Sequence, residues 1–438
     1  MHDELNFLSV SQMVVLLRQR KVSAEELLRA HLARIDAVNP QLNAIVQSDP
    51  ARALARARAA DAAAARGEWW GPLHGIPFTV KDWIETDDLV CTAGYAARRG
   101  YTPQADATAV ARMRQAGAIV LGKTNAVSGN EVYGLTNNPY NLAYSPAGSS
   151  SGEAAIIAAG GSPVGLGSDS GGSIRQPAHN CGIAGLKPTT GRVPLTGHYP
   201  RINVMNDPRT VIGPLARYVE DLALVLPLIQ GVDWRDASVV PMPLGDWRAV
   251  KLAGLRAAFY THHPDAAPAP DVAATVQRAA YSLAGAGLSV EEKRPPMVEH
   301  TWKITRDYWR RPEPESWEVW DAGEETVLTS LEVEQHLFLW EQYRRALIAF
   351  MEHVDVIVTP VVELPAQPHG QPDGSIVYTL TYSLVGYPAV VVRAGTAADG
   401  MPIGVQVVAR PWRDDVALAV AAHLEQTLGG WQPSGLAV

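Results

Sequence analysis

The sequence predicts an α/β protein, a single domain built on a large mixed β-sheet that helices cover on both faces. Helical and strand patterns alternate along all 438 residues, without an internal repeat or a low-complexity linker. A hydrophobic content of 47% with 19% charged residues is typical of a globular chain with a large core. We therefore expect one domain over residues 1–438, although chains of this length often divide into two or three.

The amino-terminal part, residues 1–70, is expected to be helical. Ser23 and Glu26 have the spacing of a capping box, in which the two side chains satisfy each other's free backbone N–H groups. Apolar side chains follow at helical intervals, and Pro40 is expected to end this helix. The alanine- and arginine-rich residues 51–65 predict a second helix.

Residues 71–222 form the predicted core of the sheet, where short apolar runs alternate with glycine and proline. Asp106 is expected to cap a helix that ends at Gly117, and residues 118–121 predict the buried strand after it. Residues 154–166 predict a short helix of small residues, suited to tight packing on a sheet, followed by a strand.

The rest of the chain divides into a variable substrate-side region, residues 223–354, and a carboxyl-terminal part of strands and a helix, residues 355–438. Within the first, tryptophan and tyrosine gather in a mainly helical segment, residues 300–350. Runs rich in β-branched residues predict buried strands at residues 355–359, 389–392 and 405–408.

Charge and composition limit the partners. A net charge of −8 argues against nucleic acid, because binding to phosphates requires a basic surface. Cys91 and Cys181 provide neither a disulfide framework nor a zinc cluster, and no histidines stand at metal-ligand spacing, so we expect no metal and no cofactor. The chain shows no basic leader and no apolar run of membrane-spanning length, which predicts a cytoplasmic protein without a membrane span.

Two short motifs match known patterns only in their letters. Residues 117–124 fit the phosphate-binding P-loop. A P-loop requires a strand before its first glycine and a helix after its lysine, whereas here a helix comes first and the intervening residues are themselves the strand, so nucleotide binding is disfavoured. Residues 148–152 fit the nucleophile elbow of α/β-hydrolases, but an irregular loop leads into them where that motif needs a strand.

Two loops rich in serine and glycine, residues 147–153 and 167–177, bracket one short apolar segment. Glycine allows backbone N–H groups to turn toward a ligand, and serine supplies a hydroxyl that can be made nucleophilic. Lys81, a lysine without an evident partner, stands in a third turn-like segment. This combination is typical of a hydrolase that uses two serines and a lysine.

Residues 148–177 resemble the signature of the amidase signature family almost throughout. The resemblance is dense from about residue 8 to 222 and resumes from 355 to 425. It implies the family's fold, a single domain with a large mixed sheet, and the family's chemistry, the cleavage of amide bonds. Flanking segments that agree with it are residues 74–77, 122–125, 181–189, 213–217, 219–222, 386–388 and 400–406.

The resemblance implies a catalytic triad of serine, cis-serine and lysine. Ser173 corresponds to the nucleophile, Ser149 to the serine that follows a non-proline cis peptide bond and relays the proton, and Lys81 to the base. A lysine accepts a proton only when neutral, which requires burial to lower its pKa below about 10.4. An acyl-enzyme would form on Ser173 and then be hydrolysed by water.

The same resemblance assigns the oxyanion hole. The backbone N–H groups of Ser170, Gly171 and Gly172, together with that of Ser173, are expected to stabilise the negative charge that develops on the carbonyl oxygen. Ser150 is expected to support the site through its hydroxyl.

Four further residues are candidates for lesser roles. Asp169 and Arg175 are expected to brace the loops by pairing with each other rather than to touch the substrate. Asn125 and Arg209 are candidate substrate-binding residues.

The substrate stays open, since the family ranges from hydrolases of fatty acid, peptide and aryl amides to the A subunit of glutamyl-tRNA amidotransferase. The aromatic residues 300–350 suit an apolar substrate wall or lid as well as they suit core packing. The stretch between Asn125 and Asn138 is several residues shorter than in most relatives, which favours an open pocket for stiff anilides or carbamates. We expect a free-standing amidohydrolase of linear amides or anilides, with a possible urethanase activity on small-molecule carbamates, and the amidotransferase subunit is the alternative.

Overall fold

The computed structural model describes residues 5–200, 208–309 and 328–437. The strands of this part of the chain are, in order, β1 (Ile45–Gln47), β2 (Pro77–Lys81), β3 (Ile119–Thr124), β4 (Gly129–Asn130), β5 (Gly134–Leu135), β6 (Val164–Asp169), β7 (Ala184–Lys187), β8 (Val211–Ala216), β9 (Arg256–Phe259), β10 (Ser289–Glu292), β11 (Val356–Pro360), β12 (Ala389–Thr396) and β13 (Pro402–Ala409). The α-helices are α2 (Val10–Arg18), α3 (Ala24–Leu42), α4 (Pro50–Ala65), α5 (Thr108–Gln115), α6 (Ser151–Ala158), α7 (Arg175–Asn180), α8 (Val219–Ile229), α9 (Pro270–Gly285), α10 (Thr301–Trp309), α11 (Ser330–Glu352), α12 (Val377–Ser383) and α13 (Asp414–Leu428).

Eleven strands of the described chain form one mixed sheet, in the order β1-β3-β2-β6-β8-β7-β12-β13-β11-β9-β10. β2 is parallel to both β3 and β6, whereas each neighbouring pair from β6 across to β11 is antiparallel. Helices pack along the sheet, with α6 against β2, β3 and β6, α13 against β12, and α9 against β9 and β11. The predicted α/β class with a large mixed sheet is confirmed.

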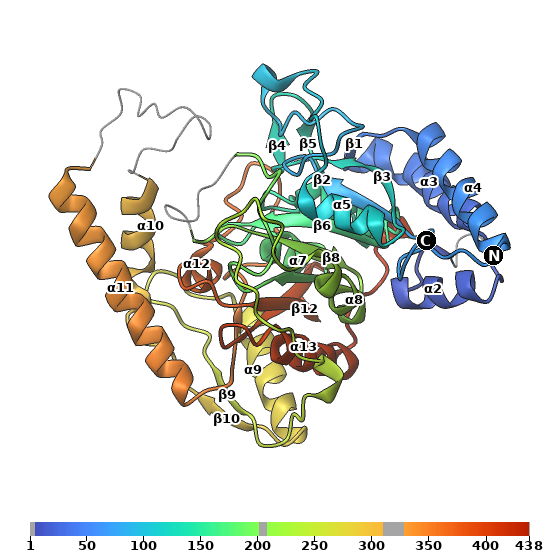
Figure 1. Cartoon of the computed structure of the whole chain (residues 1–438). Helices are drawn as coiled ribbons and strands as arrows, with labels where there is room; N and C mark the ends of the chain where they lie inside the picture. The colour runs from blue at the N-terminus through green and yellow to red at the C-terminus, as the bar shows by residue number, and fades with distance from the viewer. Residues whose placement is uncertain (1–4, 201–207, 310–327, 438) are drawn as a thin grey trace.

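Helices also mark the two flanks of the molecule (Figure 1). The amino-terminal helices α2, α3 and α4 lie on one flank, and the carboxyl terminus ends close to them. On the opposite flank the long helix α11 stands beside α10, away from the centre of the sheet.

The first predicted helix begins where expected. The Ser23 hydroxyl accepts from the N–H of Glu26, and the Glu26 carboxylate accepts from the N–H of Ser23 at 2.8 Å, so the capping box is confirmed. The expectation that Pro40 ends this helix is wrong, because α3 continues for two more residues and ends at Asn43, whose φ is 51°. A proline in the last turn removes only one N–H, and the Asn39 carbonyl still accepts from the N–H of Asn43 at 2.7 Å.

The segment that resembles a P-loop has a different structure. Gly117 ends the preceding helix with φ of 95°, as predicted, and the residues after it enter β3, where Lys123 is buried within the strand. This geometry contradicts a phosphate-binding loop, in which the lysine precedes a helix. Asp106 does not cap α5, whose N-cap is Ala107; its carboxylate accepts instead from the N–H of Asp87 at 3.0 Å.

The strands predicted near the carboxyl end are present as β11, β12 and β13, which differ from the predicted bounds mainly in length. A strand buried on both faces has no polar side to alternate with its apolar side. The length of the valine and isoleucine runs and their β-branched side chains therefore identified these strands in the sequence. In the aromatic segment 300–350 the described residues form α10 and most of α11, as predicted, and residues 310–327 lie outside the described part.

Candidate active site

The candidate residues gather where β2 and β6 end. These strands are parallel neighbours, with Val80 opposite Leu166, so their carboxyl ends lie side by side. Lys81 is the last residue of β2, and Ser168 and Asp169 close β6. In open α/β sheets the carboxyl ends of parallel strands are the usual place for a site.

Lys81 is fully buried at this edge of the sheet. Its Nζ lies 2.6 Å from Ser149 Oγ and 2.9 Å from Ser168 Oγ. Burial lowers the pKa of the Lys81 amine well below its usual value, although Asp169 and Glu153 act in the opposite direction. These surroundings favour the neutral amine, which is the form that can accept a proton.

Ser149 stands in the turn that leads into α6. Ala147 and Gly148 before it both have positive φ, 56° and 61°. A Cβ atom on Gly148 would lie 2.6 Å from Cδ of Pro177, so the close approach of α7 also requires glycine there.

The peptide bond before Ser149 is trans, which corrects the cis bond that the resemblance implies. The one cis peptide bond among the described residues is Tyr199–Pro200. The Ser149 hydroxyl meets Lys81 from a turn that contains these two consecutive positive φ angles.

Ser173 lies in the loop between β6 and α7 and is partly exposed. Its carbonyl accepts from the N–H of Ser150 at 3.1 Å, which ties the two serine loops together, and Ser150 Oγ donates to the Ser168 carbonyl at 3.3 Å. No described residue forms a hydrogen bond with the Ser173 hydroxyl. The structure thus brings Ser149 to Lys81, but it does not join Ser149 to Ser173 by a hydrogen bond.

Asp169 and Arg175 form a fully buried ion pair behind this loop. Two guanidinium nitrogens donate to the two carboxylate oxygens at 3.0 and 2.9 Å. Burial opposes the charge of Asp169, but the Arg175 guanidinium outweighs it and lowers the carboxyl pKa. Arg175 also donates to the Thr379 carbonyl and the Ser383 hydroxyl of α12, at 2.9 and 2.7 Å. The pair therefore connects the loop to α12.

The expected oxyanion hole needs one correction. The N–H of Gly172 donates to Asp169 at 2.8 Å, so it is not available to a substrate. The N–H groups of Ser170, Gly171 and Ser173 donate to no described residue and remain the candidate donors. The Ser170 hydroxyl is bound to a threonine hydroxyl at 2.6 Å.

The two candidate substrate-binding residues have different surroundings. Asn125 is buried, its amide nitrogen donates to the Gly134 carbonyl at 3.1 Å, and its amide oxygen accepts from Asn130 at 2.6 Å. Its side chain thus forms hydrogen bonds within the local loop, and its role in substrate binding stays a prediction. Arg209 is 4% exposed, and its guanidinium lies 3.7 Å from the ring centroid of Tyr308, so it packs against α10. Its role in substrate binding stays a prediction.

Sequence reasoning missed two residues beside the base. Ser168 contacts Lys81 directly, and its place before Asp169 inside the signature was a signal for it. His198 contacts Ser168 at 2.9 Å from a distant loop. A single histidine without a neighbouring ligand carries no signal in the sequence, and only the fold brings it here.

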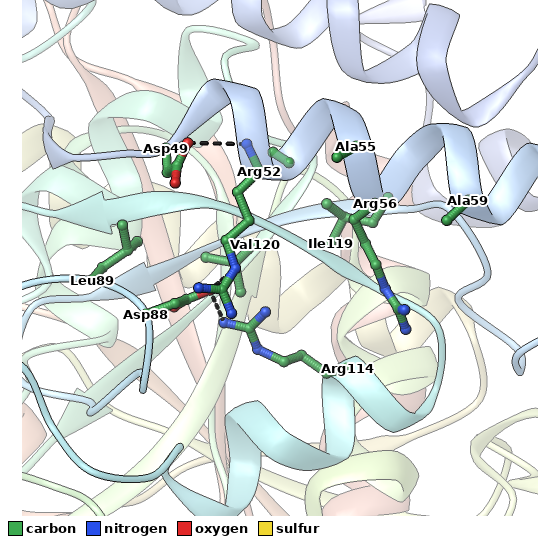
Figure 2. A pocket seen from close by; sticks show the side chains of 11 residues that line it. Asp49, Arg52, Ala55, Arg56, Ala59, Asp88, Leu89, Arg114, Ile119 and Val120 are labelled. Carbon is green, nitrogen blue, oxygen red and sulfur yellow. Dashed lines mark hydrogen bonds and ion pairs between the residues drawn. The ribbon is translucent and has the colours of Figure 1, made fainter.

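A separate pocket of about 420 Å³ lies between α4 and β3 (Figure 2). Its charged residues pair with one another, since Asp88 lies 3.3 Å from Arg52 and 2.6 Å from Arg114. Asp87, Asp88 and Asp106 are close enough together to hold a metal ion. Arg114 already contacts all three carboxylates at 2.6 to 3.9 Å. None of the candidate catalytic residues lines this pocket.

No helix within the described residues has the length and apolar character needed to cross a membrane.

Comparison with solved structures gives close matches to the whole fold. The chain superposes on a 6-aminohexanoate cyclic dimer hydrolase complexed with substrate with a TM-score of 0.85 and 28% identity, covering 99% of this chain and 100% of the other. It superposes on the peptide amidase PAM in complex with the inhibitor chymostatin with a TM-score of 0.83 and 27% identity, covering 98% and 99% of the two chains.

Comparison of sequences finds relatives along nearly the whole chain. The A subunit of glutamyl-tRNA(Gln) amidotransferase from Chloroflexus aggregans is 34% identical over 484 aligned residues, with 98% of both chains covered. The protein of the same name from Roseiflexus castenholzii is 36% identical over 469, with 94% of both covered. The Amidase family model matches residues 26–310 and 323–418. The chain therefore belongs to the amidase family, whose enzymes act on C–N bonds.

Proposed function

We propose that this chain hydrolyses amide bonds, with Ser173 as the nucleophile, Ser149 as the proton relay and Lys81 as the base. The observation that carries the proposal is the buried Lys81 amine, 2.6 Å from the Ser149 hydroxyl at the end of β2. Within the described chain this lysine has serine hydroxyls, and no carboxylate, as its hydrogen-bond partners. Such an amine is suited to take up a proton and not to hold a permanent charge.

The reaction starts with attack of Ser173 Oγ on the amide carbonyl carbon. The Ser173 proton passes to Ser149, whose own proton passes to Lys81 Nζ. The N–H groups of Ser170, Gly171 and Ser173 stabilise the oxyanion, and loss of such a donor typically costs about 10²–10³ in rate. Movement of Ser173 toward Ser149, when substrate binds, would form the hydrogen bond that the relay needs between the two hydroxyls.

The leaving amine takes its proton from Lys81 through Ser149 as the C–N bond breaks, which leaves the acyl group on Ser173. A water then attacks the ester carbonyl and gives one proton to Lys81 by the same route. Ser173 regains its proton as the carboxylic acid leaves, so the enzyme returns to its starting state.

The direct test is kinetic. Ser173→Ala should lower kcat toward a p-nitroanilide by about a thousandfold or more, and Lys81→Met should lower it by a comparable factor. Residues of one catalytic triad act as a unit, so the loss of one costs about as much rate as the loss of all. Mass spectrometry of the intact chain after treatment with a fluorophosphonate should find one adduct, on Ser173. Near-normal turnover in both variants would refute the mechanism.

A second function is supported by the relatives that carry the name of the glutamyl-tRNA(Gln) amidotransferase A subunit. In that case the chain would release ammonia from glutamine for transfer within a larger complex. The alignment with the Chloroflexus relative spans 484 positions and this chain has 438 residues, so at least 46 positions have no counterpart here. The shorter chain favours the free-standing hydrolase, since fewer segments remain for partner contacts.

The substrate class within hydrolysis is the finer part of the proposal. We expect linear amides and anilides, and extension to carbamates, whose carbonyl the same serine can attack with release of amine, alcohol and carbon dioxide. kcat/KM should be measured for L-glutamine, an aliphatic amide, an anilide and a carbamate. A preference for glutamine that increases when amidotransferase partner proteins are added would favour the second function.

A further inference from the structure

We propose that His198 is a positioning residue for the base. Acting through Ser168, it fixes the direction in which Lys81 donates a hydrogen bond and so leaves the amine lone pair directed at Ser149. The inference rests on the proposed function, because it assigns a role to a neighbour of the proposed base.

Three hydrogen bonds form a chain behind Lys81. Lys81 Nζ lies 2.9 Å from Ser168 Oγ, and Ser168 Oγ lies 2.9 Å from His198 Nε2. On the far side of the imidazole, Nδ1 lies 3.0 Å from the carbonyl oxygen of Pro200. Ser149 stands at the other end, 2.6 Å from the same amine.

The group at the end of this row of hydrogen bonds, the Pro200 carbonyl, determines which atom donates in each of them. The Pro200 carbonyl can only accept, so Nδ1 of His198 carries the hydrogen. In the neutral imidazole Nε2 is then an acceptor, and the Ser168 hydroxyl must donate to it. Ser168 Oγ in turn accepts from Lys81.

A neutral amine has two N–H groups and one lone pair. Because Ser168 takes one N–H, the rotation of the amine about its last C–N bond is restricted. The lone pair can then face Ser149, whose proton Lys81 has to accept. Without an acceptor at Ser168, the amine could donate to Ser149, which is the wrong direction for a base.

Burial makes this arrangement costly to break. Lys81, Ser168 and His198 are 0%, 2% and 3% exposed, so bulk water does not replace a lost partner. A buried donor or acceptor left unpaired costs more than the hydrogen bond was worth, and a connected network strengthens each of its members.

The backbone holds His198 in register with the segment that follows Lys81. His198 pairs with Ile84 in an isolated β-bridge. The N–H of Tyr199 donates to the carbonyl of Trp83 at 2.7 Å, and the Trp83 ring lies 4.1 Å from Lys81 Nζ. The imidazole meets the same ring edge-on at 6.0 Å. The amine and the imidazole therefore share the Trp83 ring and the backbone next to it as neighbours.

The alternative is that His198 only fills space and satisfies its own hydrogen bonds. The two roles differ in the kinetic constant that they affect. A residue that orients the base affects the chemical step, so its loss lowers kcat and leaves KM nearly unchanged, whereas a general loosening of the site changes both.

The kinetic test uses four variants and the anilide substrate. His198→Ala and Ser168→Ala should each lower kcat about tenfold, the effect expected for one lost hydrogen bond, and the double variant should be no worse than the singles. His198→Gln, which keeps an acceptor at the place of Nε2, should restore most of kcat. His31→Ala is the matched control, since His31 is buried and its ring bonds to the Gly160 carbonyl at 3.2 Å and not to a residue of the candidate site. It should reduce the melting temperature but not kcat.

A second measurement needs no turnover. The ¹⁵N chemical shifts of the His198 ring in the full chain should identify Nδ1 as protonated and Nε2 as an acceptor, and Ser168→Ala should shift the Nε2 resonance. An Nε2–H tautomer, or equal loss of kcat in the Ala and Gln variants, would overturn the inference and leave the proposed function intact. Retained turnover in Ser173→Ala would refute the proposed function, whatever the tautomer is.

Discussion

Lys81 and Asp169 are two buried ionisable side chains at the same edge of the sheet. Their surroundings favour the charged form of Asp169 and the neutral form of Lys81. Asp169 faces the Arg175 guanidinium in a buried ion pair, which keeps the carboxylate charged. Lys81 faces serine hydroxyls, and burial lowers its pKa. The neighbouring strands β2 and β6 thus end in an amine that can exchange a proton and in a permanent charge that braces a loop.

The lowered pKa of Lys81 predicts the pH dependence of the reaction. The proposed base must be neutral, so kcat/KM should increase with pH and level off above the pKa of Lys81. Because burial lowers that pKa from 10.5, the midpoint should lie well below pH 10.5. Initial rates with a neutral anilide between pH 5 and 10 measure it. A rate that does not change over this range, or that increases only above pH 10, would contradict the role of Lys81.

At the residue scale, resemblance was the part of sequence reasoning that located the site. The resemblance assigned Ser149, Ser173 and Lys81 to one catalytic triad, and the fold does bring Ser149 and Lys81 into contact. It could not show the hydrogen-bond partners of two other residues. Asn125 donates to the Gly134 carbonyl in its own loop, and the N–H of Gly172 donates to the Asp169 carboxylate. Hydrogen-bond partners of this kind depend on loop geometry, which residue types alone do not specify.

One buried carboxyl joins three elements next to the site. Glu153 of α6 accepts hydrogen bonds from Thr79 of β2 and Thr124 of β3. Burial raises the pKa of Glu153 to about 7, although both threonines and the nearby Lys123 lower it. The carboxyl therefore connects the helix after the first serine loop to the strand that carries Lys81.

This position predicts a pH-dependent stability. Between pH 4.5 and about 7 the folded chain keeps a proton on Glu153 that the unfolded chain has released, so the free energy of unfolding should decrease as pH rises through this interval. The expected decrease is on the order of 3 kcal/mol, from about 1.4 kcal/mol per pKa unit. Urea unfolding at pH 5 and pH 8 should show a smaller difference for Glu153→Gln than for the parent chain.

Asp221 and Glu425 also have pKa values raised to about 7, both mainly by burial, so the parent chain carries their contributions too. The comparison with Glu153→Gln isolates one carboxyl, because the other two are the same in both proteins. Parallel pH dependence of the two free energies would show that Glu153 is ionised at neutral pH in the folded chain.

At the scale of elements, the sequence was informative where hydrogen bonding is local. The capping box at Ser23 was read correctly, since both partners lie within four residues. The prediction that Asp106 caps a helix was wrong, because its carboxylate accepts from the N–H of Asp87 in a neighbouring loop. The order of the strands could not be derived, since pairing depends on contacts between residues far apart in the chain.

In the whole molecule, the order of strands interleaves distant segments in one sheet. β8 and β7 lie next to β12 and β13, so the strand ladder runs directly from residues 71–222 to residues 355–438. β7 pairs with β8 on one side and with β12 on the other. Neither half of the chain can complete the sheet without the other, and the candidate site depends on both, since α12 contacts the Ser173 loop through Arg175.

This interleaving predicts that the chain unfolds as one unit. Scanning calorimetry should give a single transition whose calorimetric enthalpy equals the van't Hoff enthalpy, and tryptophan fluorescence and far-UV circular dichroism should report the same midpoint. A fragment ending at residue 354 should fail to fold, because it would leave β7 without its partner β12 and β9 without its partner β11. Two separated transitions, or a stable fragment, would contradict this prediction. Either result would mean that the two halves of the sheet unfold independently, as two domains.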